Sequence, residues 1–122
     1  MSIQESGEMY LESILVLSKQ KDTVRAIDIV DYMNFSKPSV SRALSRLRED
    51  GLINTDTDGF ITFTENGRVL AEKIYNRHVV LTSFLEILGV GAETASADAC
   101  RIEHIISDET FAAMAKFSDD LI

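Results

Sequence analysis

The sequence is short of several residue types, and each shortage excludes a class of protein. It contains no tryptophan, one proline and a single cysteine, Cys100, so no disulfide can form within the chain and a disulfide-stabilised secreted domain is excluded. No apolar run approaches the roughly 20 residues that cross a bilayer, so no transmembrane helix is predicted. The first residues also lack the basic and apolar segments of a secretory signal. We therefore expect a cytoplasmic protein.

The remaining composition is that of a small globular protein. Hydrophobic residues make up 45% and charged residues 26% of the 122 positions, which is enough apolar material for one domain or two small lobes around one core. The net charge of −8 is unevenly distributed, because residues 37–48 hold four cations and no acid, whereas residues 83–122 hold eight acids and two cations. The first segment could meet phosphate and the second could meet a cation.

The first part of the chain has the pattern of a helix-turn-helix. Apolar residues at helical spacing predict helices over residues 8–19, 25–33 and 36–50. Asn34 tolerates the left-handed conformation that ends a helix, and Ser36 followed by Pro38 is typical of a helix start. A short turn between two helices, of which the second is cationic, indicates a DNA-reading element.

A hairpin and three further helices follow. Two β-rich segments, 52–55 and 60–63, flank an Asp-Gly turn, which predicts a hairpin that forms a wing. Apolar spacing then predicts helices over residues 65–88, 94–106 and 108–117. The predicted fold is therefore mainly α, with an N-terminal winged helix-turn-helix over residues 1–64 and a C-terminal helical lobe over residues 65–122.

The third predicted helix has the side chains of a recognition helix. Such a helix carries short polar and cationic groups in its first turns, which enter the major groove. Arg42 is suited to a bidentate pair with guanine, worth roughly 1–3 kcal/mol of discrimination. The remaining cations are expected to contact phosphates: Lys37, Arg46 and Arg48 on this helix, and Arg25 at the start of the preceding one. The alternative is a solvated basic face on an ordinary helical domain. The apolar positions predicted to be buried are Val40, Ala43, Leu44 and Leu47. The candidate DNA-binding residues are Arg25, Ser36, Lys37, Pro38, Ser39, Ser41, Arg42, Arg46 and Arg48.

A second group of residues has metal-ligand chemistry. Cys100, Glu103 and His104 are three and four residues apart, a spacing that places all three on one face of a helix. Thiolate, carboxylate and imidazole together suit a divalent first-row ion. Met9 and Glu12 share one face of the first predicted helix, and His78 projects from the long fourth one. The alternative for each residue taken singly is packing in the core.

These segments together resemble the diphtheria-toxin-repressor and manganese-transport-regulator family of metal-dependent transcriptional repressors. The resemblance covers nearly the whole chain and is carried by residues 7–14, 36–41, 64–68, 76–78 and 99–108. It implies an iron-type primary metal site formed by Met9, Cys100, Glu103 and His104. The manganese-type branch carries carboxylates at the positions of Met9 and Cys100, and sulfur there favours Fe(II) over Mn(II). Co(II), Ni(II) and Zn(II) are also expected to bind.

The chain departs from the iron-type pattern in two respects. His78 matches an ancillary ligand of that branch, but the other two ancillary positions carry Thr82 and Ser96, which are poor replacements. Glu12 matches a ligand of the manganese-type branch, so a site that uses Glu12 and His78 is an open alternative. The sequence given stops at Ile122, before the SH3-like domain of iron-type members, and so resembles the short members.

The expected function is a homodimeric, Fe(II)-activated repressor of metal-homeostasis genes that binds a palindromic double-stranded operator. One alternative is an Mn(II)-responsive regulator of the same family, and another is a redox regulator that senses oxidation through the Cys100 thiol. An enzyme with Cys100 and His104 as nucleophile and base is not expected, because no oxyanion-binding loop is recognisable. The apolar residues assigned to a dimer interface are Ile102, Ile105, Ile106, Phe111, Met114 and Phe117.

Overall fold

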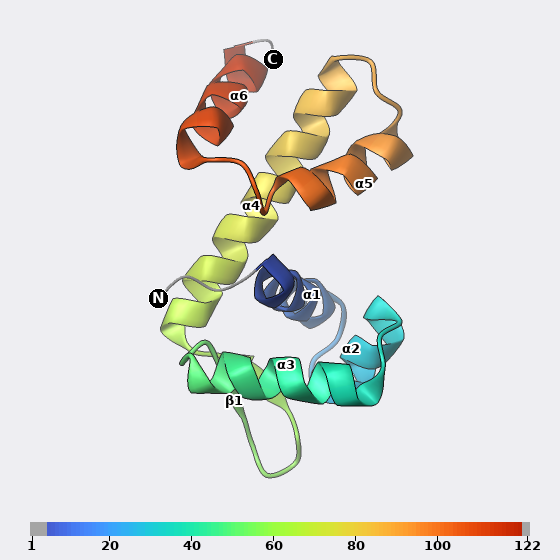
Figure 1. Ribbon diagram of the computed structural model, residues 1–122, viewed down its shortest axis with the longest axis vertical. Coiled ribbons are helices and arrows are strands. Elements are labelled where there is room, and N and C mark those ends of the chain that lie inside the picture. Colours follow the sequence, from blue (N-terminus) through green and yellow to red (C-terminus); the bar gives the residue numbers. More distant parts are fainter. Residues whose placement is uncertain (1–4, 121–122) are drawn as a thin grey trace. The chain divides into compact units, whose positions relative to one another are not determined.

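The computed structural model describes residues 5–120, and the chain divides into two compact units between Glu72 and Lys73. Its elements are α1 (Glu5–Gln20), α2 (Ala26–Met33), α3 (Lys37–Glu49), β1 (Ile53–Thr55), β2 (Ile61–Phe63), α4 (Glu65–Ile87), α5 (Ala92–Ile102) and α6 (Asp108–Asp120), as Figure 1 shows. The predicted mainly α fold with a winged helix-turn-helix is confirmed. Among the described residues, none of the helices combines the length and apolar character that crossing a membrane requires.

The turn between α2 and α3 is set by two local signals. Asn34 adopts the left-handed conformation (φ 57°, ψ 40°) and its N–H donates to the Val30 carbonyl at 2.9 Å. Ser36 caps α3, because its Oγ accepts from the Ser39 N–H at 3.2 Å, and Pro38 lies in the first turn, where its missing N–H costs little. Both caps agree with the sequence prediction.

The core of the first unit forms where α1, α2 and α3 pack against the base of the hairpin. Its largest fully buried side chains are Leu11, Ile14, Ile29, Val40, Leu47 and Ile53. Val40, Leu44 and Leu47 form the buried face of α3, as predicted, while Ala43 is half-buried. The opposite face of α3 therefore does not pack against the core.

The wing is a minimal antiparallel hairpin. Its register pairs Ile53 with Phe63 and Thr55 with Ile61. Asp56 shapes the turn, because its Oδ1 accepts from the backbone N–H groups of Asp58 and Phe60, each at 2.9 Å. The Ile61 N–H donates to the carbonyl of Val24, just before α2, at 2.8 Å. This bond ties β2 to the helical core.

A close backbone approach marks the return from the wing into α4. The Thr64 hydroxyl donates to the Gly51 carbonyl at 2.7 Å and accepts from the Gly67 N–H at 3.0 Å. A Cβ on Gly67 would lie 1.8 Å from the Leu52 carbonyl oxygen, so only glycine fits at this crossing. The turn after the recognition helix and the start of α4 are thereby held together.

The second unit comprises the rest of α4 with α5 and α6. Gly89, at φ 102°, follows the end of α4, and the Ser107 Oγ accepts from the Thr110 N–H at 3.1 Å to start α6. The helix predicted over residues 94–106 begins earlier, at Ala92, and ends at Ile102. The expectation that Glu103 and His104 both lie within this helix is therefore wrong.

The crossing at Gly67 predicts a large and local stability cost. We expect Gly67→Ala to lower the free energy of unfolding by about 3 kcal/mol, because the methyl group collides with rigid backbone. Gly91→Ala is the matched control, since nothing lies within 4 Å of a Cβ built there, and its cost should stay below about 1 kcal/mol. Urea unfolding of both variants measures the difference, and equal losses would contradict the close approach.

Candidate functional site

A buried carboxylate between two imidazoles is the central feature of the second unit. The Glu103 side chain is fully buried, and its Oε2 lies 3.0 Å from Nδ1 of His78 on α4. Its other oxygen, Oε1, lies 3.2 Å from Nε2 of His104, whose side chain is also fully buried. Glu103 and His104, which were predicted together, thus meet His78, which was predicted separately, in one cluster.

The donor set of this cluster fits a divalent cation. Carboxylate oxygen and imidazole nitrogen are the usual ligands of first-row divalent metals, and a buried carboxylate needs a positive partner. Cys100 is half-buried on the last turn of α5, three residues before Glu103. It adds a sulfur donor to the same segment of chain.

Arg77 holds the segment that carries Glu103 and His104. Its guanidinium donates through Nη1 to the carbonyls of Glu103 and Ile106, at 3.1 and 3.0 Å. Its Nη2 donates to Asp108 at the start of α6, and the guanidinium lies 5.1 Å from the centre of the Phe111 ring. The Arg77 side chain is only 11% exposed. A single side chain of α4 therefore contacts residues along the whole turn between α5 and α6, and we refer to this set of contacts as the grip of Arg77.

The same hydrogen bonds complete the turn in which α5 ends. The carbonyls at the end of a helix have no partner within it, and the Glu103 carbonyl accepts from Arg77. The Ile106 N–H makes the helical bond to the Ile102 carbonyl at 3.2 Å, and the Ile105 N–H donates to the same carbonyl at 3.0 Å, which tightens the turn. Glu103 keeps helical angles (φ −58°, ψ −25°) as the cap residue. His104 lies in the turn beyond it.

The two positions that lack the expected ancillary ligands contact His78. The Thr82 hydroxyl donates to the His78 carbonyl at 2.7 Å, and the Ser96 hydroxyl lies 3.4 Å from Nε2 of the ring. Both ring nitrogens of His78 thus have partners in this unit. Of the two contacts, only that of Ser96 involves the imidazole ring, at the nitrogen that does not face Glu103.

Met9 and Glu12 belong to the first unit. They lie one turn apart on α1 and are both half-buried. The Ser13 hydroxyl donates to the Met9 carbonyl at 2.8 Å. This bond uses the backbone of Met9 and not its thioether. The six candidate metal ligands are therefore divided between the units, two in the first and four in the second.

The exposed face of α3 carries the predicted DNA-binding groups. At its N-terminus the Ser36 hydroxyl donates to Oγ of Ser39 at 2.8 Å, and Arg42 donates to the same oxygen at 3.4 Å. Pro38, Ser41 and Arg46 are exposed along this helix, as is Lys37. Arg25 is exposed at the start of α2, where its N–H donates to Asp28 at 2.8 Å. Hydrogen bonds from Lys21 and from this N–H lower the pKa of Asp28.

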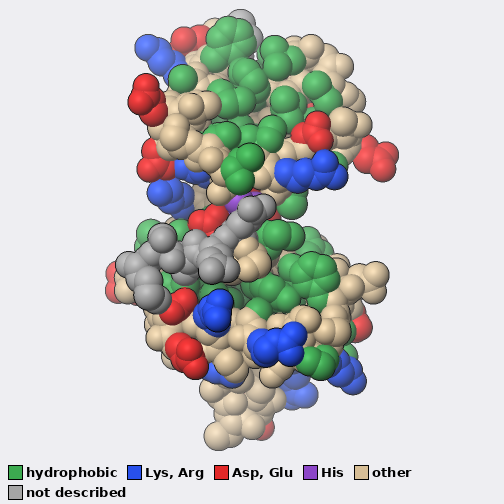
Figure 2. Space-filling view, viewed as in Figure 1, with side chains coloured by type: hydrophobic (Ala, Val, Ile, Leu, Met, Phe, Trp, Pro, Cys, Tyr) green, Lys and Arg blue, Asp and Glu red, His purple; other side chains and the backbone are tan. Residues whose placement is uncertain are grey.

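Apolar side chains remain exposed on the second unit. Ile105 is 70% and Phe117 49% exposed, and both were expected at a dimer interface. Val79 within α4, Ile87 at its last position and Leu88 just beyond it are exposed as well. Figure 2 shows apolar groups gathered on the visible face of this unit. The other expected residues, Ile102, Ile106, Phe111 and Met114, are half-buried.

A winged helix-turn-helix joined to a helical unit with a buried carboxylate and imidazole cluster is typical of metal-responsive DNA-binding regulators. Comparison with known proteins narrows this class to one family. The family description "Iron dependent repressor, N-terminal DNA binding domain" matches residues 2–59, and "Iron dependent repressor, metal binding and dimerisation domain" matches residues 64–121. The chain belongs to the iron-dependent repressor family, which confirms the resemblance seen in the sequence.

Individual relatives support this assignment. The iron-dependent repressor IdeR of Mycobacterium tuberculosis is 32% identical over 92% of this chain and 49% of its own length. The transcriptional regulator MntR of Escherichia coli is 34% identical over 89% of this chain and 70% of its own. The solved structure of the manganese regulator SloR superposes with a TM-score of 0.82 at 28% identity, over 98% of this chain and 55% of SloR. The chain thus spans about half the length of IdeR and SloR.

Sequence reasoning missed Arg77 and Asp108 as parts of the site in the second unit. Both stood in segments that carried the family resemblance, but a buried arginine has no signature of its own in a sequence. Asp108 was also expected to begin a helix, and no partner was predicted for its carboxylate.

The grip of Arg77 predicts a stability loss confined to the second unit. We expect Arg77→Met to lower the free energy of unfolding by about 2 kcal/mol, because two buried carbonyls lose their donor. The exposed Arg101→Met is the matched control and should change stability by less than about 0.5 kcal/mol. Urea unfolding gives both values, and amide hydrogen exchange at residues 105–106 should accelerate in the first variant alone. Equal stability of the two variants would contradict the assigned role.

Proposed function

We propose that this protein is a cytoplasmic, homodimeric repressor of transcription that Fe(II) activates for binding to a palindromic double-stranded operator. The observation that carries the proposal is the fully buried Glu103, flanked by the imidazoles of His78 and His104. The other unit of the chain exposes a cationic recognition helix. We therefore assign the cluster to sensing the metal ion that controls DNA binding by this helix. Residues 1–64 would read DNA, and residues 65–122 would bind metal and form the dimer.

Six residues are the proposed metal ligands. Met9, Cys100, Glu103 and His104 form the primary set, with Glu12 and His78 as additional donors. A bound divalent ion would supply positive charge and a link between donors of α1 and donors at the end of α5. Glu103 offers that ion a carboxylate already held by its neighbours.

Sulfur donors favour Fe(II) in this site. Thioether and thiolate are softer than the oxygen ligands that Mn(II) prefers. The relatives include a repressor described as iron-dependent and one described as a manganese regulator, so an Mn(II)-responsive regulator is the second candidate. Co(II), Ni(II) and Zn(II) should bind as well, in line with their general affinity order.

The DNA-binding surface is proposed to be α3 with the start of α2. Arg42 is proposed to read guanine, while the other cations of this surface have the charge that suits phosphates. Two copies of this surface on a two-fold dimer imply half-sites about one helical turn apart, or a multiple of it. The full set of proposed DNA-binding residues is Arg25, Ser36, Lys37, Pro38, Ser39, Ser41, Arg42, Arg46 and Arg48.

Metal and DNA binding should reinforce each other. Met9 and Glu12 belong to the unit that reads DNA, whereas the remaining ligands belong to the other unit. If one metal ion is bound by ligands of both units, it restricts the motion of the units before DNA binds. The conformational entropy lost on metal binding then does not have to be lost on DNA binding, so DNA binds more tightly. Couplings of this kind are typically about 1–3 kcal/mol, or roughly 5–150-fold in affinity.

The first test of this function compares DNA binding with and without metal. A duplex is selected from a random pool by the Fe(II)-loaded protein under anaerobic conditions, and its affinity is measured by fluorescence anisotropy. We expect binding at least about tenfold tighter with Fe(II) than with chelator. Cys100→Ala should weaken this response, while the exposed Thr94→Ala on the same helix should preserve it. Equal affinity in metal and chelator would refute activation by metal.

The second test exchanges the sulfur donors for carboxylates. In the variant Met9→Asp with Cys100→Glu, harder oxygen ligands should favour Mn(II), and the ratio of the Fe(II) to Mn(II) half-activation concentrations should rise about tenfold. Anisotropy titrations with each metal on the selected duplex give this ratio. An unchanged ratio would mean that these two side chains do not determine metal preference.

A further inference from the structure

The wing is too small to fix its own position. It consists of two strands of three residues each, and an isolated two-stranded hairpin is at best marginally stable in water. Its placement beside the recognition helix therefore depends on contacts with the rest of the first unit. Three arginines from separate parts of this unit supply side-chain contacts of this kind.

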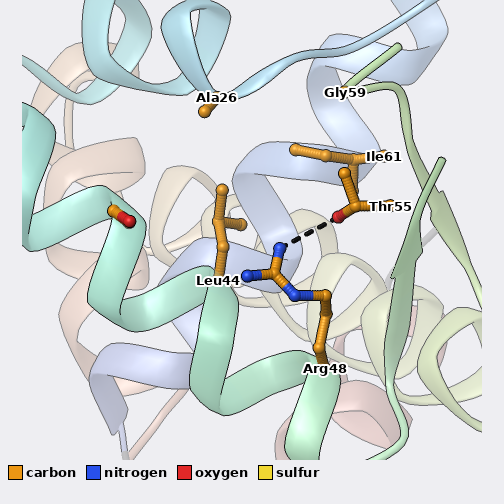
Figure 3. Close-up of a pocket in the computed structure, with 7 residues that line it drawn as sticks. Ala26, Leu44, Arg48, Thr55, Gly59 and Ile61 are labelled. Atoms are coloured by element: carbon orange, nitrogen blue, oxygen red, sulfur yellow. Dashed lines mark hydrogen bonds between the residues drawn. The ribbon is translucent and has the colours of Figure 1, made fainter. Parts of the chain in front are cut away.

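Arg48 makes the most directed of these contacts. Its Nη1 donates to Oγ1 of Thr55 on β1 at 3.0 Å, and its Nη2 donates to Oγ of Ser45 on α3, also at 3.0 Å. The guanidinium is thus oriented by its own helix and reaches across to the wing. Figure 3 shows this bond spanning the space between α3 and the strand.

The other two arginines cover aromatic rings of the second wing strand and the turn before it. The guanidinium of Arg25 lies 4.5 Å from the centre of the Phe60 ring, and that of Arg68 lies 5.3 Å from the centre of the Phe63 ring. Such contacts contribute about 0.5–1 kcal/mol each at exposed sites. They hold β2, but neither reaches Thr55 on the other strand.

A cavity shows why the bond to Thr55 is needed. A partly open cavity of about 160 Å³ lies beside this bond, and Ala26, Leu44 and Ile61 form its apolar wall. Arg48 and Thr55 also line it. The base of the wing is packed, since Ile53 and Ile61 are buried, but Thr55 is exposed beside the cavity, where close packing does not hold it. The hydrogen bond from Arg48 therefore gives the outer end of β1 a directed contact that packing does not supply.

We propose that Arg48 is a positioning residue, which sets the wing against the recognition helix through Thr55 and so presents both to the duplex. This role differs from the phosphate contact that its charge alone suggests. The inference rests on the proposed DNA-binding function. It identifies Thr55, a neutral residue, as part of the same device.

The two roles differ in their dependence on salt. The affinity falls as salt rises, because each phosphate contact releases counterions. Loss of one contact therefore makes the plot of log K against log salt less steep, by roughly 0.9 in slope. Loss of a positioning contact weakens binding and leaves the slope unchanged. Thr55→Val tests this directly, because it removes the acceptor and no charge.

The experiment is a double-mutant cycle on the selected duplex, with affinities measured over a series of salt concentrations. Arg48→Ala, Thr55→Val and the double variant should each bind about tenfold more weakly than the parent chain, since all three lose the same contact. Their salt slopes should equal that of the parent. Thr55→Ser, which keeps the hydroxyl, should restore binding. The matched control is Arg46→Ala, whose slope should fall by about 1.

A second measurement uses the protein without DNA. Backbone NMR relaxation of residues 56–60 should show greater motion in both Arg48→Ala and Thr55→Val, and parent-like motion in Thr55→Ser. Parent-like motion in the first two variants, or a lowered salt slope for Arg48→Ala beside normal binding by Thr55→Val, would overturn the inference. Failure of the parent chain to bind any duplex would refute the proposed function, while the wing motions still decide the role of Arg48.

Discussion

The grip of Arg77 on the turn after α5 is the constraint on which the candidate metal centre depends. By donating to the carbonyls of Glu103 and Ile106, this side chain holds the turn that follows the end of α5 at Ile102 and that contains His104. Within this turn Glu103 lies against the imidazoles of His78 and His104.

Four of the seven arginines contact other parts of their own unit. Arg77 is buried in the second unit, and the guanidinium groups of Arg25, Arg48 and Arg68 contact the wing. The net charge of −8 gives the chain as a whole little general attraction to DNA. Its recognition is expected to depend on where the wing and α3 are held more than on overall charge.

Local chemistry made most of the fold predictable. Asn34, Ser36 and the Asp-Gly turn act on their nearest neighbours, so their effects could be inferred from the sequence and were confirmed. The contacts of the turn after α5 could not, because the Arg77 guanidinium that donates to the Glu103 carbonyl lies 26 residues away along the chain. The cluster of His78, Glu103 and His104 lies between these cases: the residue types indicated ligands, but only tertiary packing shows that they meet. The bond from Arg48 to Thr55 likewise joins two exposed residues that no spacing rule connects.

The central claim is that metal and DNA binding are coupled, and coupling of two ligands is reciprocal. The affinity of the protein for Co(II), followed by its visible absorption, can be measured with and without the selected duplex at fixed salt. The account predicts that the duplex tightens Co(II) binding by the same factor by which Co(II) tightens duplex binding. A Co(II) affinity that is identical in the presence and absence of the duplex would contradict it.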